Sequence, residues 1–121
     1  MDAEGIRELF AGIMSVRVRR MFGGHGIYDG GSMFALEFDG EIFLKADAES
    51  ESRFIAAGSY PFVYVRGEKP FAMSCWRLPE AAFDDGGMLR GWAELAVAAA
   101  RRRGAARPIR RPGSSPRSRP R

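Results

Sequence analysis

The sequence is poor in the residues that build disulfides and metal sites, because its 121 positions include one cysteine and one histidine. A lone Cys75 excludes a disulfide within the chain and is typical of a reducing compartment. A lone His25 excludes every metal motif that needs two histidines. We therefore expect the chain to fold without a metal ion, a cofactor or a disulfide.

Long apolar segments are also missing. No apolar run approaches the roughly 18 residues that a membrane-spanning helix requires. The N-terminal segment MDAEGIRELF has neither the basic start nor the apolar stretch of a signal peptide. The sequence therefore predicts a cytoplasmic protein with no membrane contact. Its apolar fraction of 45% and aromatic fraction of 12% are sufficient for one folded core.

Acidic residues are absent from residues 104–121, which hold six arginines among glycine, alanine, serine, proline and a single isoleucine. This composition cannot bury enough apolar surface to order the backbone, so we expect one domain at residues 1–103 followed by a disordered Arg/Pro-rich tail. The domain keeps 13 of the 19 basic residues against all 15 acidic ones, a net charge of −2. The candidate nucleic-acid contacts are therefore the tail arginines, Arg107, Arg110, Arg111, Arg117, Arg119 and Arg121.

Hydrophobic periodicity predicts helices at residues 2–14, 47–57 and 85–103. An aspartate stands at the start of each as the expected N-cap. In the second helix we expect Phe54 and Ile55 to face inward. Glycines are expected to end the second helix at Gly58 and the third at Gly104.

Alternating or turn-bounded apolar runs predict strands at residues 15–22, 27–28, 33–38, 41–45, 61–65 and 71–78. Asp39-Gly40 predicts a tight hairpin turn, because a type I′ turn requires positive φ at both central residues. We also expect Gly23 or Gly24 to adopt a backbone conformation that other residues avoid. Summarised as α-β-β-β-α-β-β-α, the order predicts a two-layer α+β fold whose mostly antiparallel sheet carries its helices on one face.

Catalytic machinery is not evident in the sequence. A Cys75–His25 dyad would need the two side chains to meet, and the favoured interpretation is a buried Cys75 in a strand and a His25 in a loop. GGHGIY lacks the pattern of a phosphate loop, and the carboxylates have no spacing typical of acid–base catalysis. We therefore expect a protein that is not an enzyme.

Two patterns allow a binding interpretation beside a structural one. Arg17 and Arg19 project from one face of their strand and Arg20 from the other, as either a basic strip for phosphates or a solvated sheet face. Trp76 lies in an aromatic strand that is more typical of a core than of a platform for bases.

Four segments, read together, resemble one family: RRMFGGHGIY, MFAL followed by DGEIFLKAD, PFVYV, and FAMSCWRLPE. With the closing helix and its Trp92, they resemble the N-terminal domain of the TfoX (Sxy) family of bacterial proteins over nearly all of residues 1–103. The resemblance implies the fold order given above and kinship to regulators of natural competence, which are thought to act with the cyclic-AMP receptor protein. It supplies no catalytic residues. Those regulators carry a second, helical domain where this chain has its tail, so we expect a stand-alone form of the domain.

The family motif implies scaffold or interaction roles for Met21, Phe22, Gly23, Gly24, Gly26, Tyr28, Met73, Ser74, Trp76, Arg77 and Pro79. From these, the basic strip and the histidine of the glycine cluster, we take as candidate interaction residues Arg17, Arg19, Gly23, Gly24, His25, Tyr28, Trp76 and Arg77.

The leading functional hypothesis is a non-enzymatic regulatory module that binds a protein, either a transcription regulator or a polymerase-associated factor, or a second copy of itself. A second hypothesis is non-specific nucleic-acid binding through the tail together with Arg101, Arg102 and Arg103. A third is a small-molecule sensor, or an unrecognised enzyme, with a pocket near Tyr28 and Trp76.

Overall fold

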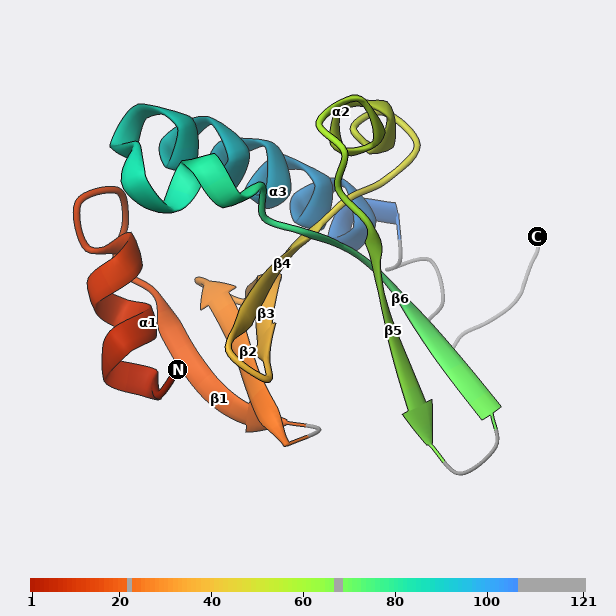
Figure 1. Cartoon of the computed structure of the whole chain (residues 1–121), viewed down its shortest axis with the longest axis horizontal. Coiled ribbons are helices and arrows are strands. Elements are labelled where there is room, and N and C mark those ends of the chain that lie inside the picture. The colour runs from red at the N-terminus through yellow and green to blue at the C-terminus, as the bar shows by residue number, and fades with distance from the viewer. Residues whose placement is uncertain (22, 67–68, 107–121) are drawn as a thin grey trace.

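The structure, a computed structural model, describes residues 1–21, 23–66 and 69–106, with side chains described for residues 1–21, 23–63 and 74–104. In these ranges six strands form one sheet beside three α-helices (Figure 1). The α+β class predicted from the sequence is confirmed. Within the described ranges, no helix is both long and apolar enough to cross a membrane.

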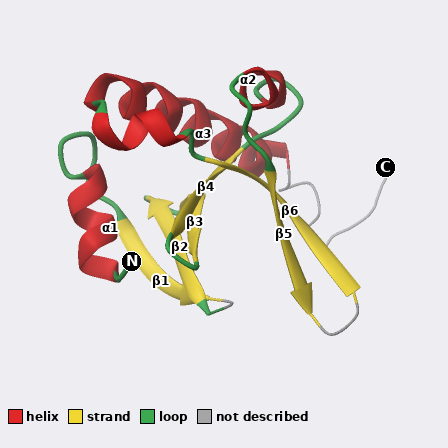
Figure 2. Ribbon diagram, viewed as in Figure 1, coloured by secondary structure: helices red, strands yellow, loops and turns green. Residues whose placement is uncertain are grey.

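The sheet has the strand order β1-β2-β3-β4-β6-β5, and all neighbouring strands are antiparallel (Figure 2). The strands are β1 (Arg17–Met21), β2 (Gly24–Asp29), β3 (Ser32–Phe38), β4 (Glu41–Lys45), β5 (Pro61–Arg66) and β6 (Lys69–Arg77). Four strands precede the second helix, one for each of the four segments predicted there, so the summarised order with three was one strand short.

The tight turns follow their sequence signals. Asp39 and Gly40 both have positive φ, 54° and 82°, as the type I′ prediction requires. Gly30, with φ 61°, turns the chain between β2 and β3. These turns hold β2, β3 and β4 in a continuous meander.

The first helix, α1 (Ala3–Phe10), begins as predicted but ends sooner. Asp2 accepts a hydrogen bond from the Gly5 amide at 2.8 Å and is the N-cap. The predicted helix ran to residue 14, whereas residues 11–13 form a turn in which the Ile13 amide bonds back to Phe10. The turn redirects the chain into β1 while Ile13 and Met14 still pack against the core.

The second helix, α2 (Glu51–Ala56), is shorter than predicted. Asp47 caps the preceding turn, where its carboxylate accepts from the amides of Glu49 and Ser50. Gly58 ends the segment with φ 78°. The prediction for Ile55 was wrong: Phe54 is fully buried, but Ile55 is 58% exposed, because successive residues of a helix point about 100° apart.

The last helix, α3 (Gly86–Ala106), is capped by Asp85, whose carboxylate accepts from the amides of Gly87 and Met88. It passes through Gly104, where the sequence predicted its end. A short 3-10 helix, η1 (Glu80–Asp84), precedes it and was not predicted.

One face of the sheet carries the main core. Residues of all three helices join a single buried cluster with sheet residues such as Ile27, Ala35 and Leu44. The Phe10 and Phe34 rings meet edge to face at 5.5 Å, and Phe54 of α2 lies 4.6 Å from the Trp92 ring of α3. The prediction that the helices cover one face is therefore confirmed; we call the opposite face the open face.

A smaller cluster on the open face consists of strand residues alone: Leu36, Phe43, Phe62 and Cys75 are buried, with Phe38 packed beside them. Phe62 of β5 reaches the rings of Phe43 at 4.9 Å and Phe38 at 5.6 Å. On the open face, the β5–β6 hairpin therefore buries apolar side chains, as the helices do on the opposite face.

Candidate functional site

The glycine-rich hairpin joins β1 to β2 and needs two glycines for different reasons. Gly23 has φ 80°, a conformation that L side chains rarely adopt. Gly24 lies so close to β3 that a Cβ there would overlap the Glu37 carbonyl oxygen and come within 3.2 Å of the Phe38 Cα. The prediction that Gly23 or Gly24 has a specialised backbone conformation is confirmed by Gly23.

Gly26 makes room for three large side chains on the open face. A Cβ at this position would lie 2.7 Å from the Met21 Sδ, 3.1 Å from the Met33 Sδ and 3.2 Å from the Tyr28 ring. A bulge in the β2–β3 ladder sets Tyr28 opposite Met33. Tyr28 therefore lies beside two methionines, over a strand that has no side chain at Gly26.

Arg17 and Arg19 are exposed on β1, which ends the sheet on one side. The register pairs Arg17 with Tyr28 and Arg19 with Gly26, so both arginines adjoin the open face. Within the described part of the chain, neither has a hydrogen-bonding or ion-pair partner for its side chain. Arg20, also exposed, projects from the opposite face, as its position in the alternation predicts.

His25 lies in strand β2 rather than in a loop, which corrects the sequence prediction. Its Nδ1 is 2.7 Å from Oε1 of Glu37, a carboxylate only 4% exposed. The other Glu37 oxygen accepts from the Gly40 amide at 2.8 Å and lies 3.7 Å from the N-terminal amine. This cluster ties the N-terminus to the β3–β4 turn.

The structure does not bring Cys75 and His25 together. His25 and Glu37 are cross-strand partners in register with Ile42, a residue of the main core. Cys75 belongs to the cluster on the open face, fully buried, and burial raises the pKa of its thiol to about 11. Its predicted role as a small buried side chain in a strand is therefore confirmed.

Trp76 and Arg77 are neighbours in β6 with different surroundings. Trp76 packs into the main core and stacks on Phe54 at 6.3 Å. It is therefore separate from Tyr28, and the predicted pocket shared by Tyr28 and Trp76 is not formed.

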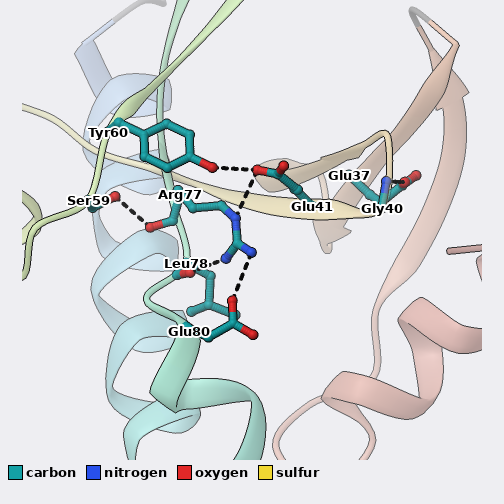
Figure 3. Close-up of polar contacts among 8 residues, drawn as sticks. All are labelled: Glu37, Gly40, Glu41, Ser59, Tyr60, Arg77, Leu78 and Glu80. Atoms are coloured by element: carbon teal, nitrogen blue, oxygen red, sulfur yellow. Dashed lines mark hydrogen bonds and ion pairs between the residues drawn. The ribbon is translucent and has the colours of Figure 1, made fainter.

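Arg77 is the centre of a polar network (Figure 3). Its guanidinium donates to Glu41 at 3.0 Å, to Glu80 at 3.1 Å and to the Leu78 carbonyl. Tyr60 donates to the same Glu41 oxygen at 2.6 Å, and the guanidinium carbon lies 5.4 Å from the Phe83 ring centre. Tyr60 and Arg77 lower the pKa of Glu41, and the bond to Glu41 raises the pKa of Tyr60.

This network fastens β4 and β6 to the segment that leads into α3. The neighbouring groove, about 510 Å³ in volume, is lined by Tyr60, Arg77, Glu80 and Trp92 among others. Because its charged groups already bind one another, Arg77 is a structural residue rather than a free contact. Glu41 and Tyr60 were not predicted from the sequence to belong to this network, since they lie 36 and 17 positions from Arg77 and no local pattern connects them.

The arginines at the end of α3 are mostly paired within the domain. Arg101 binds Asp29 at 2.8 Å, and Arg102 binds Asp47 at 2.6 Å and Glu49 at 3.2 Å. Arg102 lowers the pKa of Asp47 to about 2. A phosphate that bound either arginine would have to compete with these ion pairs. The six tail arginines and Phe22 lie outside the described residues.

Replacing Arg102 with glutamine should lower the free energy of unfolding only slightly at pH 7, because the ion pair with Asp47 that is lost is partly exposed and screened by water. The pKa of Asp47 is about 2 in the folded state against an ordinary 3.8. The stabilisation is therefore complete above about pH 4 and declines as the pH falls toward 2. Urea titrations of parent and variant at several pH values should show a difference that is constant from about pH 5 to 7 and shrinks below 4. If the parent and the variant differ in unfolding free energy as much at low pH as at neutral pH, the Arg102–Asp47 ion pair is not the cause of the difference.

A model of the family described as the TfoX N-terminal domain matches residues 8–100. The match takes in 93 of the 121 residues, including all four segments that carried the resemblance. No curated protein matches the chain.

Proposed function

The chain belongs to the TfoX N-terminal domain family, and we propose that it is a non-enzymatic regulatory module of the bacterial cytoplasm that binds a protein along strand β1. The partner we propose is an acidic, extended segment of a transcription regulator or a polymerase-associated protein. Family membership is consistent with a regulatory domain; the partner and its binding mode are the proposal.

The observation that carries the proposal is the basic edge of the sheet. Arg17, Arg19 and Arg20 are exposed on a strand that has a neighbour on one side only. An edge strand can accept an extended segment through its free backbone groups, and flanking arginines favour an acidic one. Charged residues on an edge strand also prevent it from pairing with strands of other chains. The proposal therefore needs a test that distinguishes partner binding from this protective role.

Three groups that could take part in catalysis, Cys75, His25 and Glu41, are each held in a structural contact, which supports a non-enzymatic role. Burial keeps the Cys75 thiol protonated at neutral pH, since its pKa is about 11. Glu37 binds the His25 ring, and Glu41 is held by Tyr60 and Arg77. Each of these groups already has a structural contact that a catalytic role would have to replace.

Reversing Arg17 and Arg19 together should abolish capture of the partner. The bait is the full chain, the lysate is bacterial and nuclease-treated, and retained proteins are compared quantitatively by mass spectrometry. The matched control is R53E/R90E, which makes the same change in net charge at two exposed arginines that lie on helices α2 and α3, away from strand β1. A true partner is retained by the parent and the control and falls at least about tenfold with R17E/R19E, the scale of losing paired charges at an interface.

Two results would contradict the proposal. One is that no protein shows this pattern, or that both double variants lose the same proteins equally. The other is that proteins are retained only from a parallel lysate that has not been treated with nuclease, which would favour nucleic-acid binding instead. Melting temperatures of both variants should match that of the parent, because the four arginines are exposed.

A further inference from the structure

A second hollow lies where the end of α3 meets the open face. It has a volume of about 350 Å³, within the size range of small-ligand pockets. Its lining includes Tyr28, Ser32, Met33, Lys45 and Arg103, together with Met21. These residues come from β1, β2, β3, β4 and α3, so only the folded chain assembles them.

The hollow carries two positive charges without counter-ions. Lys45 and Arg103 have no hydrogen-bonding or ion-pair partner for their side chains among the residues that the structure describes. Arg103 differs in this from its neighbours, because Arg101 is bound to Asp29 and Arg102 to Asp47. The acids nearest in the fold are thus already neutralised, and like charges lining one hollow favour an anionic ligand.

The rest of the lining suits an apolar, flat group. The Tyr28 ring lies beside the sulfur atoms of Met21 and Met33, because Gly26 leaves their space open. Aromatic faces and methionine sulfurs pack well against planar rings. Tyr28 and Ser32 each add a hydroxyl that can donate to a phosphate oxygen.

We propose that this hollow binds a phosphate-bearing small molecule of mononucleotide size. Lys45 and Arg103 hold the phosphate, and the ring of the ligand packs against Tyr28, Met21 and Met33. The C-terminal end of α3, the negative end of its dipole, adjoins the site and would repel an anion. Binding therefore needs both Lys45 and Arg103 to offset this repulsion. This site does not rest on the proposed protein partner, and it is tested with no partner present.

The test is calorimetric titration of the full chain with each of the four common ribonucleoside 5′-monophosphates. At least one should bind, and its nucleoside and inorganic phosphate should each bind at least about tenfold more weakly, since each keeps half of the contacts. K45Q and R103Q should each weaken binding at least about tenfold, whereas the exposed control R90Q on the same helix should not. The tail is present in every sample, so it cannot produce the difference.

A second measurement locates the ligand. With carbon-13 methyl groups on the methionines, the Met21 and Met33 signals should shift on titration, and that of Met88 should not. A short RNA with and without a 5′-phosphate shows whether the bound phosphate group belongs to a free nucleotide or to the end of an RNA. If the phosphorylated RNA binds more strongly than the mononucleotide, the ligand is the 5′ end of a nucleic acid. Unchanged Met21 and Met33 signals at millimolar nucleotide, or affinities insensitive to K45Q and R103Q, would overturn the proposal.

Discussion

Replacing Gly24 with alanine should cost at least about 3 kcal/mol of unfolding free energy, enough to unfold much of a domain this small. The added Cβ would overlap the Glu37 carbonyl oxygen, which is backbone and cannot rotate away. This overlap can be removed only if β2 and β3 move apart, which would disturb the sheet because it runs through both strands. Denaturant titration followed by circular dichroism measures the loss.

Gly31→Ala is the matched control, because a Cβ there meets nothing within 4 Å and its φ is ordinary. It should change the free energy of unfolding by less than about 0.5 kcal/mol. If Gly24→Ala unfolds at the same denaturant concentration as Gly31→Ala, the close approach of β2 to β3 is wrong.

Trp92→Ala should lower the free energy of unfolding by about 3 kcal/mol, the lower end of the range for buried aromatic residues, since Trp92 is partly exposed. Its ring lies 4.6 Å from Phe54, which in turn stacks on Trp76. Removing it leaves a void where α2, α3 and β6 meet. The remaining stability would be small for a domain whose total is about 5–15 kcal/mol.

Met88→Ala provides the comparison for Trp92, because Met88 lies on the same helix and is 41% exposed. That variant should lose less than about 1 kcal/mol. If denaturant titration shows that Trp92→Ala and Met88→Ala lose similar amounts of unfolding free energy, the face of α3 assigned to the core is incorrect.

Local signals in the sequence determined the ends of elements and the class of the fold. Asp2 and Asp85 cap helices, Asp39-Gly40 makes a type I′ turn, and Gly23 takes positive φ. Each depends on the preferences of a few adjacent residues, which act before any distant contact forms. The alternation of apolar residues likewise predicted an antiparallel sheet with helices on one face.

Predictions made from local signals were wrong where tertiary packing favoured a different arrangement, as at Ile55 and Gly104. Ile55 is as apolar as a core residue, but α2 is only six residues long and Phe54 takes the single direction that faces the core. Gly104 weakens a helix without forbidding one, and α3 continues past it. Intrinsic propensities of about 1 kcal/mol are easily outweighed by tertiary contacts.

Which candidate residues remain free for binding was decided by tertiary structure alone. Arg17, Arg77 and Arg102 are the same residue type in the sequence, yet the fold leaves the first exposed and binds the other two to acids far along the chain. Lys45 was not singled out from the sequence, and Arg103 was expected only to act with the tail, yet the two line one hollow because β4 and α3 end close together. Charge pairing and cavity formation depend on distances across the fold, and a sequence specifies those only once its elements have packed.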